Sequence, residues 1–166
     1  MKIKQSETLF FRRKDVDSDK ENMYIFTDNT DRDSGSGKID EDSWYSKKYG
    51  NGKHFPSITS AVIRGLDNAY PITTQRWYND KNKGVSGRWT DEDFEDFKKV
   101  IDDDFKTIYE NFKRYKNIII PYGGIFNSQI ANISKDRTPV LFSYLKGKLF
   151  ILDSEVNFYN KTNEES

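Results

Sequence analysis

Residues 90–124, TDEDFEDFKKVIDDDFKTIYENFKRYKNIIIPYGG, decide the fold of this chain. The first part predicts one long helix over residues 90–115, because its apolar side chains recur at steps of three and four. Thr90 and Asp93 have the spacing of a capping box, and acidic first turns with basic last turns match the helix dipole. The apolar stripe consists of Phe94, Phe97, Ile101, Phe105, Ile108, Phe112 and Tyr115.

The second part predicts a buried strand over residues 117–121 that ends in a sharp turn. Gly123 and Gly124 break the strand, and residues 125–133 can then form a helix. Glycine allows close backbone approach to a ligand, and the free N–H groups of a following helix bind anions. Asn127 would stand at the start of that helix. The alternative is that the glycines only turn the chain.

Two more elements are expected before residue 90. Residues 23–27 are a β-prone run. Residues 57–68 predict a helix with one apolar face, which Pro71 would end. Residues 72–89 show no clear element.

The C-terminal part predicts a further helix. It would begin with Thr138 as its cap and Pro139 in its first turn, and end near Gly147. Residues 149–152 then form either a last strand or another helical turn.

These elements predict a single α/β domain with a small, mainly parallel sheet and flanking helices, in a Rossmann-like arrangement of two or three layers. We place an N-terminal arm with one short edge strand at residues 1–22, the domain at 23–159 and a frayed polar tail at 160–166.

Composition excludes several classes of function. Hydrophobic residues make up 34% of the 166 residues and charged residues 33%, but three Trp, ten Tyr and twelve Phe indicate a folded core. The lack of cysteine and the single histidine exclude disulfides and multi-histidine metal sites, so we predict no metal and assign no cofactor. No signal peptide or membrane-spanning run is present, which predicts a cytoplasmic protein without a membrane partner.

The basic aromatic segment 44–89 is the first candidate for a binding site. It holds all three tryptophans and eight cations against two aspartates, although the whole chain is neutral. Arg76 precedes Trp77, and Arg88 precedes Trp89. A guanidinium binds phosphate while an aromatic ring stacks on a base. Neighbouring residues on a strand point to opposite faces, however, so the rings can instead be core residues covered by the arginines.

The polar loop after residue 27 is the second candidate. Asp28, Asn29 and Asp31 follow the expected strand directly, with Arg32 beside them. Such side chains at a strand end bind the hydroxyls of a sugar, or a hard cation, or simply favour a turn. Arg32 argues against the cation.

Several motifs resemble uncharacterised small proteins from phages and mobile elements, over the chain from Tyr24 to about Leu145. The resemblance lies in Phe26-Thr27-Asp28-Asn29-Thr30-Asp31-Arg32, Trp44-Tyr45, Lys48-Tyr49-Gly50, Ala61-Val62-Ile63-Arg64-Gly65-Leu66, Thr74-Gln75-Arg76-Trp77-Tyr78 and Gly87-Arg88-Trp89. It implies a phage-encoded protein with a host-takeover or anti-defence role.

The turn Pro121-Tyr122-Gly123-Gly124 also loosely resembles the glycine turn of Rossmann-like nucleotide-binding proteins of the SLOG or lysine-decarboxylase-like type. Here Ile125-Phe126-Asn127 replaces the end of that turn, and no glutamate follows before Glu155.

We therefore expect the protein to bind a nucleotide or an ADP-ribose-like phosphorylated small molecule at the strand ends. Arginines would contact phosphate, carboxylates the sugar, and an aromatic ring the base. The acidic remainder of the chain argues against long nucleic acid. The expected ligand-binding residues are Asp28, Asn29, Asp31, Arg32, Arg64, Gln75, Arg76, Trp77, Arg88, Gly123, Gly124 and Asn127.

Two other functions stay open at this point. One is a nucleotide-processing hydrolase or transferase, with Asp28 and Asp31 as catalytic candidates. The other is a phage protein–protein interaction module, for which exposed tryptophans would be expected. A homo-oligomer is compatible with each of these functions.

Overall fold

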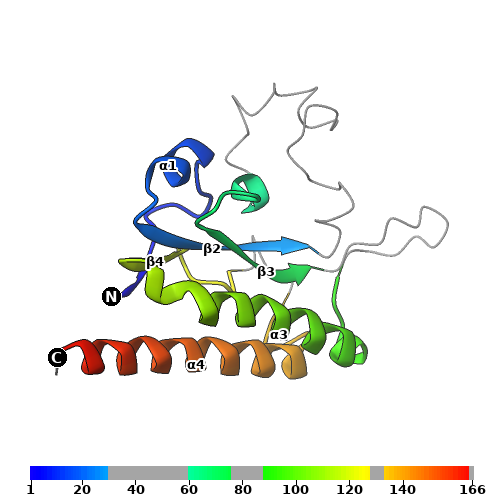
Figure 1. The fold of residues 1–166 in the computed structure, drawn as a ribbon. Coiled ribbons are helices and arrows are strands. Elements are labelled where there is room, and N and C mark those ends of the chain that lie inside the picture. Colours follow the sequence, from blue (N-terminus) through cyan, green and yellow to red (C-terminus); the bar gives the residue numbers. More distant parts are fainter. Residues whose placement is uncertain (30–59, 76–87, 128–132, 165–166) are drawn as a thin grey trace, which may run out of the picture.

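The computed structural model describes residues 1–29, 60–75, 88–127 and 133–164. Its centre is a four-stranded sheet in which all strands run parallel, in the order β1-β4-β2-β3 (Figure 1). This confirms the predicted small parallel sheet with flanking helices. The strands are β1 (Ile3–Gln5), β2 (Asn22–Asn29), β3 (Ala69–Gln75) and β4 (Asn117–Ile120).

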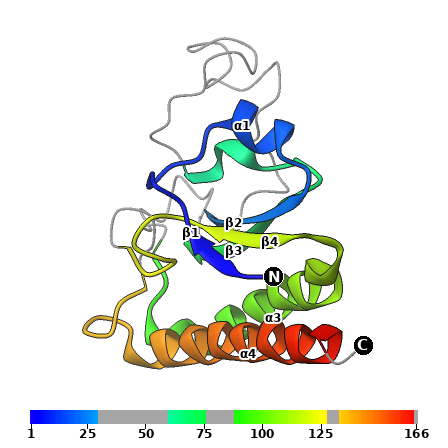
Figure 2. The ribbon, with the colours of Figure 1, turned by 90° about the vertical axis from the view of Figure 1, so that its left-hand side faces the viewer.

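Helices cover both faces of the sheet, as the two views of the ribbon show (Figures 1 and 2). The long helices α3 (Phe94–Asn111) and α4 (Pro139–Glu164) lie on one face. The short α1 (Arg13–Ser18) and the 3₁₀ turn η1 (Ser60–Ile63) lie on the other. Two further 3₁₀ turns, η2 (Asp91–Asp93) and η3 (Phe112–Arg114), extend α3 at its ends.

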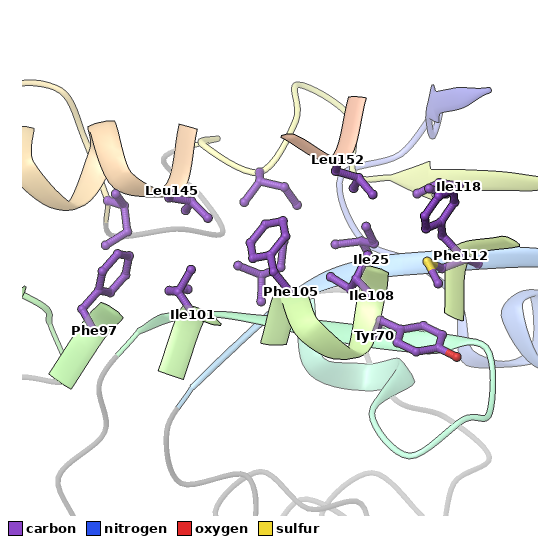
Figure 3. Close-up of a cluster of buried hydrophobic side chains, with 14 of the residues drawn as sticks. Ile25, Tyr70, Phe97, Ile101, Phe105, Ile108, Phe112, Ile118, Leu145 and Leu152 are labelled. Atoms are coloured by element: carbon purple, nitrogen blue, oxygen red, sulfur yellow. The ribbon is translucent and has the colours of Figure 1, made fainter. Parts of the chain in front are cut away.

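Alternation along the strands supplies both faces with apolar side chains. Met23 and Ile25 of β2 join the core beneath α3 and α4, whereas Tyr24 and Phe26 face α1 and η1. A parallel sheet with both faces covered needs such two-sided apolar strands. In Figure 3, labelled side chains from the sheet, α3 and α4 converge in the larger core.

The prediction of a long helix over residues 90–115 is confirmed. Thr90 and Asp93 form the capping box, with the Thr90 amide donating to the Asp93 carboxylate at 2.9 Å. Phe97, Phe105 and the other central members of the apolar stripe are buried against the sheet. The strand predicted at residues 117–121 is present as β4.

The helix predicted over residues 57–68 is wrong in its described part. Only η1 is helical there, and the chain then turns at Gly65, whose φ of 88° does not fit a right-handed helix. The next residues form β3, which the sequence analysis missed because it contains Pro71. β3 is an edge strand, where a proline without an N–H donor is tolerated.

The helix predicted from Pro139 is present but longer than expected. α4 continues through Gly147 to Glu164, so residues 149–152 are helical rather than a strand. The apolar stripe of Leu145, Leu152 and Val156 continues past the glycine and keeps the helix on the core. The helix also includes Asn160, whose side chain exchanges hydrogen bonds with Met1 at 3.0 and 2.7 Å.

The edge strand expected in the N-terminal arm is β1, which pairs with β4. The helix α1 in the same arm was not predicted. One turn with a single buried side chain, Val16, gives no periodic signal in the sequence.

Asp102 of α3 links the two long helices. Its carboxylate accepts hydrogen bonds from Lys98 at 2.9 Å, from Lys148 of α4 at 3.0 Å, and from the hydroxyl of Tyr144. Partial burial of Asp102 opposes its ionisation, but these three donors outweigh that effect and lower its pKa to about 2.

The link makes a prediction about acid stability. Because the pKa of Asp102 is lower in the folded state, its contribution is complete above the unfolded pKa near ~4 and disappears as the pH falls towards 2. Asp102→Asn should therefore lower the free energy of unfolding at pH 7, and the difference from wild type should shrink between pH 4 and 2. Urea unfolding at pH 7, 4, 3 and 2 measures this.

The exposed neighbour Asp103 provides the matched control, since Asp103→Asn makes the same charge change on the same helix. A difference between Asp102→Asn and wild type that stays constant down to pH 2 would contradict this description of the link.

Candidate functional site

The carboxyl ends of all four strands meet at one edge because the sheet is parallel. β2 and β4 are neighbours in the sheet. After β2, the next described element is η1 on the α1 face; after β4, the next is α4 on the opposite face (Figure 2). Open α/β sheets bind ligands outside the carboxyl ends of strands at such a change of side. This edge is therefore the first place to look for a site.

Asp28 and Arg64 lie together at this edge as a buried ion pair. The Nε of Arg64 donates to the Oδ2 of Asp28 at 2.8 Å, and Nη2 donates to Oδ1. The side chain of Asp28 is 0% exposed and that of Arg64 is 10% exposed. A bidentate pair of this kind fixes the end of β2 to the turn after η1.

The pairing bears on the roles expected for both residues. Both carboxylate oxygens of Asp28 already accept from Arg64, so neither is presented to a substrate as an unoccupied base. The guanidinium of Arg64 likewise donates to the carboxylate of Asp28, where the sequence had predicted a contact with a phosphate. The two residues come together as the sequence suggested, but as partners of one another.

The glycine turn after β4 is present. Gly123 and Gly124 have φ values of 78° and 82°, which favour glycine over other residues. The amide of Gly123 donates to the side chain of Gln5 at 3.1 Å, and Asn127 donates to the carbonyl of Tyr122 at 3.3 Å. A Cβ on Gly123 would lie 2.8 Å from Nδ2 of Asn127. Contacts within the protein thus account for much of this turn.

The helix predicted from residue 125 is wrong in its described part. Residues 125–127 form a turn and Ile125 is buried in the main core. No helix begins within residues 125–127, and residues 128–132, which belong to the predicted helix, lie outside the described residues.

Three of the remaining predicted site residues, Asn29, Gln75 and Arg88, lie in the described part of the chain, and the other four do not. Gln75 ends β3 opposite Asn29 of β2, so both lie at the carboxyl edge. Arg88 is exposed, whereas Trp89 beside it is buried and packs edge-on against Phe97 at 5.5 Å. The core interpretation therefore holds for Trp89. Asp31, Arg32, Arg76 and Trp77 lie outside the described residues.

A cavity of about 490 Å³ lies in the loop that follows the carboxyl end of β1. Its lining residues include Ser6 and Thr8, the charged Arg12 and Asp15, and Phe10. Phe11 and Tyr24 lie at its wall in an edge-on contact with ring centroids 5.2 Å apart. This cavity was not predicted from the sequence, where the run Leu9-Phe10-Phe11 before two arginines is the feature that could have indicated it.

Backbone hydrogen bonds hold this loop at the sheet edge. The amide of Ser6 donates to the carbonyl of Ile120 at 2.8 Å, and the amide of Tyr122 donates to the carbonyl of Thr8 at 3.2 Å. The loop after β1 is thus attached to the glycine turn after β4. The cavity begins at this edge, where Gly123 lies, and extends over the α1 face of the sheet to Tyr24, near the start of β2.

The two arginines beside the cavity have different environments. Arg13 is partly buried and donates to the carbonyls of Val62 and Arg64 at 2.9 and 2.8 Å, and burial lowers its pKa below the ordinary value. Arg12 is exposed, lines the cavity, and has no ion-pair partner among the described residues. Arg13 therefore joins α1 to η1, while Arg12 is the cation available to an anion.

The described residues contain neither a metal-binding cluster nor a membrane-spanning helix. Within them, no three His, Cys, Asp or Glu side chains gather as a metal site. Nor does any helix in those ranges combine the length and apolar character needed to cross a membrane.

The parallel sheet, its two helical layers and its carboxyl-edge cavity define a domain of the open α/β class. The chain belongs to the family of unknown function DUF7831, which it matches over residues 6–148. No curated protein and no solved structure matches the chain. The family match includes the cavity and the Asp28–Arg64 pair.

The burial of this ion pair makes a prediction about stability. Arg64→Met removes the guanidinium and leaves the carboxylate of Asp28 buried beside an apolar side chain. The free energy of unfolding should fall by about 3–5 kcal/mol, the usual effect of removing one partner of a buried pair. The double variant Asp28→Asn with Arg64→Met should lose less than the two single variants together.

Urea unfolding of the four proteins measures the coupling, and Arg88→Met is the matched exposed control. A loss for Arg64→Met no greater than that for Arg88→Met would show that Arg64 is not a structural anchor.

Proposed function

We propose that the protein binds a phosphorylated, nucleotide-like small molecule at the carboxyl edge of its sheet, in the cavity of the loop 6–12. The observation that carries the proposal is the set of groups that line this cavity. One cationic, one acidic, two hydroxyl-bearing and three aromatic residues line one volume of about 490 Å³, namely Arg12, Asp15, Ser6, Thr8, Phe10, Phe11 and Tyr24. Small-molecule pockets commonly measure roughly 300–1,000 Å³.

Each part of such a ligand has a chemical counterpart in the lining. Arg12 offers a planar pair of N–H donors to a phosphate. The carboxylate of Asp15 and the side-chain oxygens of Ser6 and Thr8 offer acceptors to the hydroxyls of a sugar, while the hydroxyl of Thr8 itself donates to the carbonyl of Phe10 at 2.8 Å. Phe10, which is half-buried, offers a ring beside which a base can stack.

Charge favours a small ligand over a long polyanion. The chain has a formal net charge of +0 at pH 7, and Asp15 stands in the cavity with Arg12. A nucleic acid would need several cations to follow its phosphates, whereas one mononucleotide needs few.

Binding is favoured over turnover as the activity at this edge. Of the two candidates for a catalytic base, only Asp28 lies in the described residues. Arg64 donates to both of its carboxylate oxygens, so neither oxygen is presented to a substrate as an unoccupied base. With the resemblance to phage proteins, this supports sequestration of a signalling nucleotide in the host cytoplasm as an anti-defence role.

The proposal predicts ligand-dependent stabilisation that requires Arg12. Melting temperatures would be measured with AMP, ADP, ATP, ADP-ribose and cyclic dinucleotides. At a concentration of about 100 times the Kd, a ligand should raise the melting temperature by roughly 5–10 °C. Arg12→Ala should remove most of this rise because the phosphate loses its bidentate donor.

Lys14→Ala is the matched control, since Lys14 is an exposed cation close to Arg12 that does not line the cavity. Its ligand response should equal that of wild type. A flat response of wild type to the whole panel, or an equal loss in both variants, would refute the proposed site.

A further inference from the structure

The outward face of α4 exposes four large apolar side chains. Val140, Phe150, Ile151 and Phe158 are 48%, 71%, 44% and 69% exposed. The opposite face of the helix, with Leu145 as one member, packs into the core. Exposed apolar side chains gathered on one helix face indicate a contact surface for another protein. No described element covers this face (Figure 1).

Small residues separate the large ones along this face. Ser143, Gly147, Phe150 and Ser154 follow one another at steps of four, three and four, so they form one line along the helix. Apart from its chain neighbours and the nearby backbone of α4, no atom of the described residues lies within 4 Å of the place where a Cβ on Gly147 would stand. Small side chains at such positions let a second helix approach closely.

The two flanks of this line differ in character. Tyr144, Ile151 and Phe158 recur every seven residues and form a largely apolar flank. Ile151 and Phe158 are exposed, whereas Tyr144 is half-buried and its hydroxyl donates to Asp102 of α3. Lys146 and Asp153, also seven apart, occupy the other flank and are both exposed. A partner helix must therefore place apolar side chains beside the first flank and charged side chains beside the second.

We propose that a second copy of this chain docks on α4, with the two α4 helices antiparallel and related by a two-fold axis beside Phe150 and Ile151. In an antiparallel pair, each flank faces the same flank of its partner. Ile151 then meets Ile151 of the second copy. Tyr144 and Phe158 lie seven residues on either side of Ile151, so Phe158 of one copy meets Tyr144 of the other.

The charges agree with this orientation. The same axis brings Lys146 of each copy beside Asp153 of the other, and Gly147 opposite Ser154 at the closest approach. A parallel pair would instead set the apolar flank against Lys146 and Asp153. The face of α4 is complementary to itself only when the two helices are antiparallel. We therefore choose a second copy of the chain over an unrelated partner.

Other contacts keep this face outward. Lys148 on the inner side of α4 is bound to Asp102 of α3, and the hydroxyl of Tyr109 donates to the carbonyl of Lys148 at 2.8 Å. The contact from Val140 to Phe158 would extend roughly 27 Å along the helix. A single helix pair of this length is a small interface, so the dimer should depend on concentration.

Single-cysteine variants test the proposal, because the chain contains no cysteine. Ile151→Cys places the two thiols next to each other at the axis, and mild oxidation should give a disulfide-linked dimer. Ser143→Cys is the matched control on the same exposed face. In the antiparallel pair its two thiols lie roughly 23 Å apart along the helix, so it should not cross-link.

Light scattering over a concentration series of the unmodified chain accompanies the cross-linking. The mass should rise towards that of a dimer, and Phe150→Asp should raise the dissociation constant at least tenfold. Cross-linking of Ser143→Cys, with or without cross-linking of Ile151→Cys, would show that the helices do not pair antiparallel about this axis and would overturn the proposal. A monomer at every concentration, with neither variant linked, would overturn it as well.

Discussion

The parallel pairing of β2 with β3 on one side and with β4 on the other is the constraint on which the rest of the structure depends. Parallel neighbours cannot be joined by a short hairpin, so the chain must cross a face of the sheet between strands. One crossover, α3, covers one face, and η1 lies on the other. Both faces are then buried, and every strand must supply apolar side chains to each of them.

The same constraint gathers the functional candidates at one edge and separates them by role. Asp28 and Arg64 hold the end of β2, and Arg13 joins α1 to η1 through two backbone carbonyls. Arg12 keeps an exposed guanidinium in the cavity beside this framework. An edge held together by these hydrogen bonds, with the exposed cation of Arg12 beside it, is a suitable support for an anionic ligand.

Elements with an unbroken apolar pattern between residues close together in the chain were predicted correctly from the sequence. Phe97 and Phe105 belong to an unbroken helical stripe, so α3 could be located correctly. β3 was missed because Pro71 argues against a central strand, and an edge position depends on neighbours distant in the chain. Charge and residue type drew attention to Asp28 and Arg64, but their pairing across 36 residues is set by the fold. The cavity depends on loop contacts that have no periodic signature.

The central claim is that the loop after β1 holds a phosphorylated ligand. Amide chemical-shift mapping tests it most directly, by titration of the ¹⁵N-labelled chain with the nucleotide that gives the largest thermal shift. A ligand held in this loop should cause saturable shifts concentrated in residues 6–16 and at Tyr24. Shifts that are absent there, or that appear instead along the outward face of α4, would contradict it.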